Sequence, residues 1–389
     1  MVDRDPRDAA LRFIRLCLRS RWDPPALDGA RALLTQLAPN AHAVCELARR
    51  ERVGPLLYDA VRKKDLLPAE VEAALRQSYY LTAACNLRLF EALDQALRAL
   101  AARGIEVIVL KGAALAQTVY PSVGLRPMGD LDVLVRPASV PAAREVLAEL
   151  GYHATGVEVR PGSDLAFESE VCLVRPGPPA VPLELHWSLF DVPHYQQTLP
   201  LSWFWATAQT VPLGGGPALV LGPEALLLHL CGHLVLHHGS GEAALLWEHD
   251  VAAVLAHDQP AIDWPLLLRQ AEECALVLPL QEVLGRVAAE WAAPVPPDAL
   301  AQLNALTPGN VEAQTVAQRT AARRPVARRF WNDLASLHGW RARLRYAWIQ
   351  LFPAPAYMRH RYGITRAWLL PLYYPYRWSI GLRGLWSRR

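Results

Sequence analysis

IEVIVLKGAAL at residues 105–115 and RPMGDLDVLV at residues 126–135 are the two stretches that decide the fold of this 389-residue chain. Their runs 105–110 and 131–135 are short, apolar and rich in β-branched residues, and turn residues bound them. This pattern predicts two buried strands.

The segments around these strands complete a mixed α/β core. Short helices are predicted at 113–119 and 138–150, and the second ends at Gly151, a common residue just after a helix. Two further strands are predicted at 165–174 and 181–189, and the Pro-Gly-rich segment between them is typical of a hairpin. This order of elements predicts a small mixed sheet.

The rest of the chain is predicted to be helical. Apolar residues recur at three- and four-residue spacing within 1–104 and again within 223–291, whereas the Pro-rich segment 294–309 is expected to be a connection. We therefore predict an α+β protein in which N-terminal and C-terminal helical regions flank the core. The expected domains are an N-terminal helical region (1–104), the core (105–212), a helical domain that follows a break at Gly214-Gly215-Gly216-Pro217 (213–310), and a helical tail rich in Arg and Trp (311–389).

The composition is that of a folded globular protein. Hydrophobic residues make up 52% of the chain, and the length allows two to three domains, each with its own core. The six cysteines show no C-x-x-C spacing, so the sequence predicts neither a structural zinc site nor a disulfide framework. The first residues include acids where a secretory signal needs a cationic run, and Pro371 and Pro375 interrupt the most apolar later stretch. We expect a soluble cytoplasmic protein without a transmembrane segment.

The charge is distributed unevenly along the chain. Residues 319–389 contain fifteen Arg and one acid, Asp333, so the tail carries +14 and the remainder −11. A basic amphipathic helix is predicted in the tail; it would suit RNA, an anionic membrane surface or the acidic body of the chain itself. Its apolar stripe consists of Phe330, Leu334, Leu337, Leu344, Trp348 and Leu351, and the neighbouring arginines are Arg328, Arg329, Arg341, Arg343 and Arg345.

Asp130 and Asp132 are candidates for binding a divalent cation. They lie two residues apart at a predicted strand, so both carboxylates project from the same face. Proteins hold Mg²⁺ through one or two carboxylates plus substrate phosphates, and two ions about 3.5–4 Å apart can bind the attacking and leaving oxygens of a displacement. The alternative is a solvated pair of aspartates at the end of a strand.

Glu184 is the third candidate carboxylate. In the strand PLELHW at 182–187, Glu184 and His186 lie on the face opposite to the leucines. If this strand pairs beside 130–135, the three carboxylates converge, and His186 contacts the substrate or a carboxylate. Otherwise Glu184 is an ordinary charge on a strand and His186 is a half-buried histidine.

Lys111 and Gly112 suit a phosphate group. The chain has only three lysines, and Gly112 allows close backbone approach at the start of a helix whose free N–H groups attract an anion. Arg126 can bind phosphate oxygens bidentately. In the simpler alternative, Lys111 is a charge at the end of a strand and Arg126 pairs with Asp130.

Histidines are concentrated in the later helical region, and three of them are spaced four residues apart on one helical face. Two histidines at this spacing can bind zinc, but Leu234 occupies the position of the glutamate in H-E-x-x-H. A polar seam packed against the core is therefore favoured, while His233 and Asp250 are alternatives for the acceptor side of a cleft. The histidines are His229, His233, His237, His238 and His249.

These motifs together resemble a known family. LKG at 110–112, RPMGDLDVLV at 126–135 and LELHW at 183–187, together with Tyr120-Pro121 and Gly151-Tyr152, are similar to the uncharacterised bacterial nucleotidyltransferase family of the polymerase-β superfamily. More distantly, they resemble AbiEii-type toxin nucleotidyltransferases. The resemblance covers most of the chain, because the helical segments 228–250 and 263–264 also match the pattern of that family.

The resemblance implies a polymerase-β-like core and transfer of a nucleoside monophosphate, with two Mg²⁺ ions, from an NTP to a hydroxyl acceptor. The acceptor would be a peptide, protein or saccharide; the alternatives are a toxin-like enzyme that acts on RNA, through the basic tail, or a catalytically decayed nucleotide-binding scaffold. Superfamily members usually carry Gly-Ser or Gly-Gly at the phosphate turn, whereas here Gly112 is followed by Ala113 and Ala114, so a hydroxyl contact to the triphosphate is missing. The resemblance implies Asp130, Asp132 and Glu184 as the catalytic metal ligands. From the residues themselves we expect Lys111, Gly112 and Arg126 at the nucleotide, and His186, His233 and Asp250 are candidates for the acceptor side.

Overall fold

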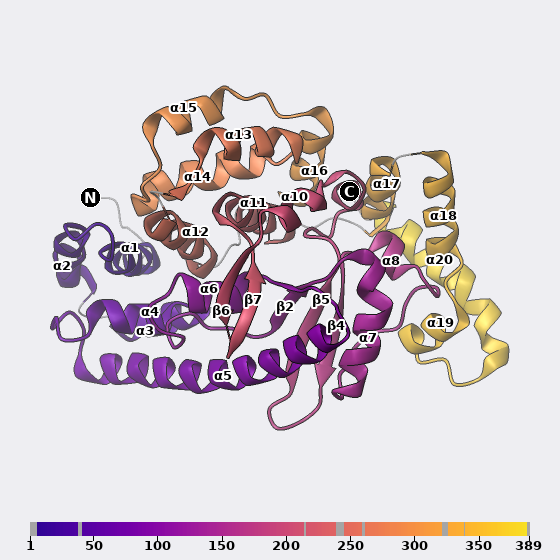
Figure 1. Cartoon of the computed structure of the whole chain (residues 1–389), viewed down its shortest axis with the longest axis horizontal. Helices are drawn as coiled ribbons and strands as arrows, with labels where there is room; N and C mark the ends of the chain where they lie inside the picture. The colour runs from indigo at the N-terminus through magenta and orange to yellow at the C-terminus, as the bar shows by residue number, and fades with distance from the viewer. Residues whose placement is uncertain are drawn as a thin grey trace.

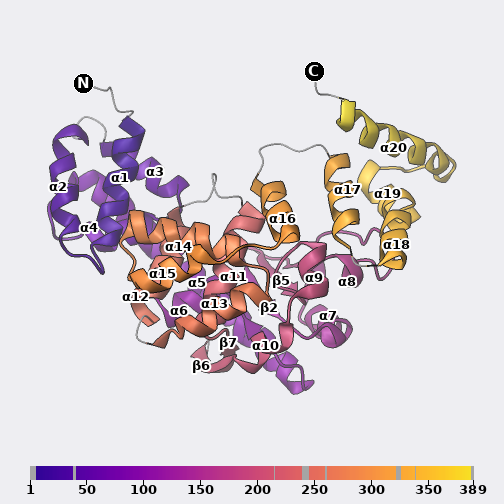
Figure 2. The same cartoon turned by 90° about the horizontal axis from the view of Figure 1, so that it is seen from above.

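The computed structural model describes residues 6–37, 41–213, 215–238, 245–258, 261–320, 326–337 and 339–386. A seven-stranded mixed sheet lies at the centre, with helices on both faces (Figure 1). The helical region at the N-terminus and the helices of the tail lie at opposite ends of the molecule (Figure 2). Gly214, part of the predicted break, lies outside the described residues.

The sheet has the strand order β3-β4-β5-β2-β1-β7-β6. Strand β2 runs parallel to β5 and β1 runs parallel to β7, whereas the other neighbours are antiparallel. The predicted mixed sheet is confirmed. Its strands are β1 (Ile108–Val109), β2 (Leu131–Leu134), β3 (His153–Ala154), β4 (Glu170–Arg175), β5 (Val181–His186), β6 (Gln209–Leu213) and β7 (Gly216–Val220).

Two segments differ from their predicted structure. The predicted strand 165–174 begins as the short helix α8, and β4 starts only at Glu170. The predicted connection 294–309 contains helix α15, because Pro297 stands in the first turn, where a missing N–H costs nothing. Strand β7 lies beyond residue 212, the predicted end of the core, yet it pairs with β1 in the same sheet. The division of the chain into four domains stays a prediction.

Helices account for most of the remaining chain. Their order along the chain is shown by colour in Figure 1. They are α1 (Pro6–Arg19), α2 (Ala26–Leu37), α3 (Ala41–Arg50), α4 (Gly54–Val61), α5 (Ala69–Ala102), α6 (Lys111–Thr118), α7 (Val140–Glu149), α8 (Asp164–Phe167), α9 (Pro193–Thr198), α10 (Leu201–Ala206), α11 (Pro223–His233), α12 (Leu245–Asp258), α13 (Trp264–Glu273), α14 (Val277–Trp291), α15 (Pro297–Ala305), α16 (Asn310–Thr320), α17 (Val326–Ser336), α18 (Trp340–Leu351), α19 (Pro355–Tyr362) and α20 (Leu370–Trp386).

The two faces of the sheet pack against different helices. Residues of odd number in β2 and β5, such as Val133 and Leu185, join a core with α5 and α7. On the other face, Ile108 and Leu134 join a larger core that includes α11–α14 and the N-terminal helices. This alternation leaves the side chains at even positions of β2 and β5 on the face toward α11 and α12, where three of them are polar.

The tail packs against the body through a small core of its own. Tyr346 and Ile349 of α18 contact Phe167 of α8, and the backbone N–H of Ala354 donates to the carbonyl of Val159 at 2.7 Å. The predicted docking of the tail on its own chain is therefore observed for one face of α18. Within the described ranges, none of the helices combines the length and apolar character that a membrane span requires.

Candidate active site

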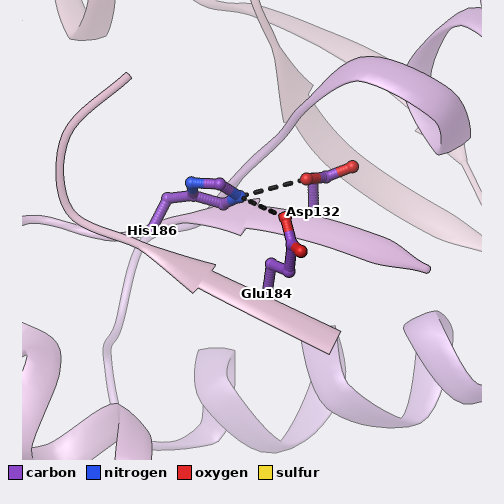
Figure 3. Close-up of side chains that lie close together, drawn as sticks. All are labelled: Asp132, Glu184 and His186. Atoms are coloured by element: carbon purple, nitrogen blue, oxygen red, sulfur yellow. Dashed lines mark hydrogen bonds and ion pairs between the residues drawn. The ribbon is translucent and has the colours of Figure 1, made fainter. Parts of the chain in front are cut away.

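Parallel pairing of β2 with β5 brings two of the three predicted carboxylates together, those of Asp132 and Glu184; Asp130 precedes β2. The register sets Asp132 opposite Glu184 and Leu134 opposite His186. Asp132, Glu184 and His186 project from the same face and point toward one another (Figure 3). Their neighbours in the strands are leucines and valine buried on the other face, which fixes this orientation.

Lys111 lies at the centre of this group. Its Nζ is 2.8 Å from Asp132 Oδ1 and 3.9 Å from Glu184 Oε2. Burial lowers the pKa of Lys111, but Asp132 and Glu184 outweigh it, so the pKa is raised and the side chain stays charged. Lys111 is thus an ion-pair partner of both carboxylates at the start of α6.

His186 connects three carboxylates. Its Nε2 is 3.0 Å from Asp132 Oδ1 and 3.5 Å from Glu184 Oε2, and its Nδ1 is 2.9 Å from Glu170 Oε2. Burial and Lys111 lower the pKa of His186, yet hydrogen bonds to the carboxylates raise it to about 10. The raised pKa favours the protonated imidazole, whose two N–H groups donate to carboxylates. Of the two contacts expected for His186, with the substrate or with a carboxylate, the structure shows the contact with carboxylates.

The same contacts act on Asp132. Burial raises its pKa, but the charge of Lys111 and the hydrogen bond from His186 outweigh burial, and the net shift is strongly downward. Asp132 therefore stays ionised with 4% of its surface exposed. An ionised, buried carboxylate is the oxygen ligand that hard divalent cations prefer.

Two groups of side chains in the described part of the chain could hold a metal ion. One consists of Asp132, Glu184 and His186, and the other of Glu170, Cys172 and Glu184; within each group the ligand atoms lie within 4.8 Å of one another. Asp130 belongs to neither group, because it precedes β2 in a bend. Burial, followed by the charges of Asp132 and Glu184, raises its pKa, so its carboxylate lies within electrostatic range of the cluster.

Strand β4 contributes two residues that the sequence analysis did not identify. Glu170 pairs with His186 and Cys172 pairs with Glu184 in the antiparallel register of β4 and β5. Burial is the largest single influence on Glu170 and raises its pKa, but the hydrogen bond and charge of His186, together with the charges of Lys111 and His237, outweigh burial and lower the pKa to about 2. The period-two alternation of EVCLVR places both side chains on one face of the predicted strand, and the missing information was the register that sets this face beside His186 and Glu184.

Arg126 and Asp250 form a buried ion pair near the site. Arg126 Nη2 donates to Asp250 Oδ2 at 2.8 Å, and Tyr120 donates its hydroxyl hydrogen to Asp250 Oδ1 at 2.6 Å. The predicted alternative pairing of Arg126 with Asp130 is wrong, because the guanidinium is turned toward α12. Asp250 has 1% of its surface exposed and its carboxylate contacts Arg126 and Tyr120, so its expected place on the acceptor side stays a prediction.

Comparison with known proteins identifies the chain. The family model described as "Uncharacterised nucleotidyltransferase" matches residues 38–292, which is more than half of the chain. The chain belongs to this nucleotidyltransferase family. It is therefore an enzyme that transfers nucleotidyl groups.

A solved structure is also similar to this nucleotidyltransferase. It is an antigenic nucleotidyltransferase-like protein from Paracoccidioides brasiliensis, with 12% sequence identity and a TM-score of 0.37. The similarity covers 55% of this chain and 96% of that protein. No curated protein matches the chain.

The two alanines after Gly112 face the interior of the nucleotidyltransferase. Ala113 and Ala114 are 1% and 4% exposed and belong to the core with α5 and α7. A hydroxyl on either side chain would therefore enter an apolar core in this chain. Their small size suits the packing of α6 against the sheet.

The histidines of the nucleotidyltransferase form a packed seam, as predicted. A π-helical turn, Leu234–His238, breaks the four-residue spacing, so that the rings of His237 and His238 both lie against His233, with centroids at 4.7 and 4.8 Å. His237 is exposed and accepts a hydrogen bond from the backbone N–H of Asp191 at 3.1 Å, whereas burial and then the charge of Lys111 lower the pKa of the half-buried His238 to about 4. None of these histidines joins a metal-binding group in the described ranges.

Gly112 makes room for Arg126. A Cβ atom at Gly112 would lie 2.5 Å from Arg126 Nη1 and 3.3 Å from Met128 Cγ, and the ion pair with Asp250 holds that guanidinium in place. We expect Gly112→Ala to lower the free energy of unfolding by about 1–3 kcal/mol, the usual cost of overpacking. Denaturant unfolding followed by circular dichroism measures this change.

Gly285→Ala is the matched control. Gly285 lies inside α14, and a Cβ there would meet no atom within 4 Å. We expect this variant to be as stable as the wild type or about 0.5–1 kcal/mol more stable, because alanine favours a helix. Equal stability of the two alanine variants would contradict the close approach of Gly112 to Arg126.

Proposed function

We propose that this nucleotidyltransferase binds Mg²⁺ at Asp132 and Glu184 and transfers a nucleoside monophosphate from an NTP to a hydroxyl acceptor. The observation that carries the proposal is the pairing of Asp132 with Glu184 across β2 and β5, with Lys111 in contact with both. The same arrangement of carboxylates on adjacent strands supports a polymerase-β-like core.

The charges of the cluster fit a divalent cation. Four carboxylates, those of Asp130, Asp132, Glu170 and Glu184, surround the two cations Lys111 and His186. The ionised cluster thus has two more negative than positive charges, and its ligands are mainly carboxylate oxygens, which suit Mg²⁺. Because its two ring nitrogens lie 3.0 Å from Asp132 Oδ1 and 2.9 Å from Glu170 Oε2, we assign His186 to holding these two carboxylates in place, and we assign the metal to carboxylates.

The reaction is a displacement at the α-phosphorus of the NTP. The acceptor oxygen forms a bond to this phosphorus, the bond to the bridging oxygen breaks, and pyrophosphate leaves with the electron pair. Bound Mg²⁺ would neutralise charge that develops on the phosphoryl oxygens. We assign to Glu184 the proton released by the acceptor hydroxyl, because it is the most exposed acid that contacts both Lys111 and His186.

Lys111 and Arg126 have different proposed roles. Lys111 supplies positive charge next to the carboxylates, where the triphosphate would bind, and can transfer its ion pair from Asp132 to phosphate oxygens. Arg126 was predicted to bind phosphate, but its buried pair with Asp250 favours a positioning role beneath Gly112. Asp130 is proposed as a further metal ligand on the strength of its electrostatic contact with the cluster.

Label transfer tests the proposed reaction. The wild type, given an α-³²P-labelled NTP and Mg²⁺, should label one member of a panel of peptides, proteins, saccharides and RNA. Glu184→Gln should reduce the rate of labelling at least about a hundredfold. The reason is that this variant loses a carboxylate proposed both to bind the metal and to accept the proton. Glu149→Gln is the control, since Glu149 is exposed at the end of α7 and pairs with Arg103. Equal rates for the two variants would overturn the proposed role of Glu184.

A further inference from the structure

Helix α18 exposes an apolar stripe. Trp340, Leu344, Trp348 and Leu351 recur every three or four residues and are 66%, 60%, 55% and 43% exposed. The opposite face of the helix carries Tyr346, which is buried against Phe167. Docking of the tail on the body therefore leaves most of this stripe exposed, although the guanidinium of Arg160 lies over the ring of Trp348, 5.9 Å from its centroid.

A second stripe runs along the end of the chain. Trp368 precedes α20, and Leu372, Tyr376 and Ile380 follow it at steps of four residues; all four side chains are exposed. The opposite side of α20 faces α18, because Trp378 donates its indole N–H to the carbonyl of Leu351 at 2.8 Å. The contact between α18 and α20 thus does not cover either stripe.

Exposed arginines accompany the two stripes. Arg359, Arg361 and Arg366 lie in α19 and the segment after it, and each side chain is exposed. The chain has no acidic residue after Asp333. The surface formed by α18, α19 and α20 is therefore apolar and strongly basic.

We propose that α18–α20 bind the surface of a lipid bilayer that contains anionic phospholipids. Tryptophan favours the membrane interface, arginine pairs with lipid phosphates, and helices with apolar stripes lie in the interface plane. The aliphatic residues Leu344, Leu372 and Ile380 favour lipid over nucleic acid, because a polynucleotide offers phosphates and stacking bases but no acyl layer. The inference is independent of the reaction that the enzyme catalyses.

Vesicle flotation with the full chain tests this surface. The wild type should float with vesicles of phosphatidylcholine and phosphatidylglycerol, and much less with vesicles of phosphatidylcholine alone. Leu344→Gln combined with Leu372→Gln should weaken binding at least about tenfold, because less apolar surface is buried. Replacing Arg359, Arg361 and Arg366 by Gln should weaken it by about a hundredfold, at roughly fivefold for each basic residue.

Leu81→Gln combined with Leu87→Gln is the matched control. Both leucines are exposed on α5, 59% and 61%, far along the chain from the tail. This variant should bind the anionic vesicles as the wild type does. The proposal is overturned if the wild type does not float with anionic vesicles, if the two leucine variants bind equally, or if the full chain binds single-stranded RNA but not the vesicles.

Discussion

Asp132→Asn is expected to reduce nucleotidyl transfer by about a thousandfold or more. Asp132 contacts Lys111 and His186 and is a proposed metal ligand. The asparagine amide therefore removes a negative charge that interacts with Lys111, His186 and the proposed metal ion. A thousandfold loss corresponds to about 4 kcal/mol of transition-state stabilisation, within what a catalytic metal supplies. The measurement is the initial rate of transfer from a labelled NTP, at a temperature where circular dichroism shows that the variant is folded.

Asp94→Asn controls for the loss of a buried aspartate. Asp94 is also buried and paired with an arginine, Arg98, but it lies on α5, away from the polar face of the sheet. We expect its rate to stay within about threefold of the wild type, since it contacts none of the proposed site residues. If Asp132→Asn and Asp94→Asn lose activity to the same degree, the carboxylate of Asp132 has no special role in transfer.

Asp250→Ala is expected to cause the largest loss of stability. It would leave the guanidinium of Arg126 buried without its partner and remove an acceptor from Tyr120. Removing one partner of a buried ion pair costs about 3–5 kcal/mol, and denaturant unfolding measures it. Arg126→Met combined with Asp250→Ala should cost less than the sum of the single changes, because the double variant leaves no buried charge unpaired.

Asp258→Ala is the control on the same helix. Asp258 is the last residue of α12 and pairs with the exposed His257. Its loss should change stability by no more than about 0.5 kcal/mol. Equal stability of Asp250→Ala and Asp258→Ala would show that the pair with Arg126 does not support the site.

The sequence predicted the site where local rules were sufficient. The alternation in β2 and β5 places Asp132, Glu184 and His186 on one face, and the apolar residues between them determine which face is buried. Their proximity required only that the two strands be neighbours. Proximity is thus predictable, whereas the ligand role of these residues stays a proposal.

The sequence did not predict contacts that depend on distant packing. The partner of Arg126 is Asp250, more than a hundred residues later, and no local pattern indicates this pair. Glu170 lies inside the predicted strand 165–174, but no local pattern gives the register that pairs it with His186. The π-helical turn at 234–238 likewise changed the spacing of the histidines in a way that helical periodicity does not anticipate.

Mn²⁺ binding tests the central claim most directly. Mn²⁺ takes the place of Mg²⁺ at carboxylate sites and can be titrated by electron paramagnetic resonance, with and without a non-hydrolysable NTP analogue. We predict that the wild type and Asp94→Asn bind Mn²⁺ with equal affinity, whereas Asp132→Asn and Glu184→Gln, although folded, bind at least about tenfold more weakly. Undiminished Mn²⁺ binding by both site variants would contradict the assignment of the metal to Asp132 and Glu184.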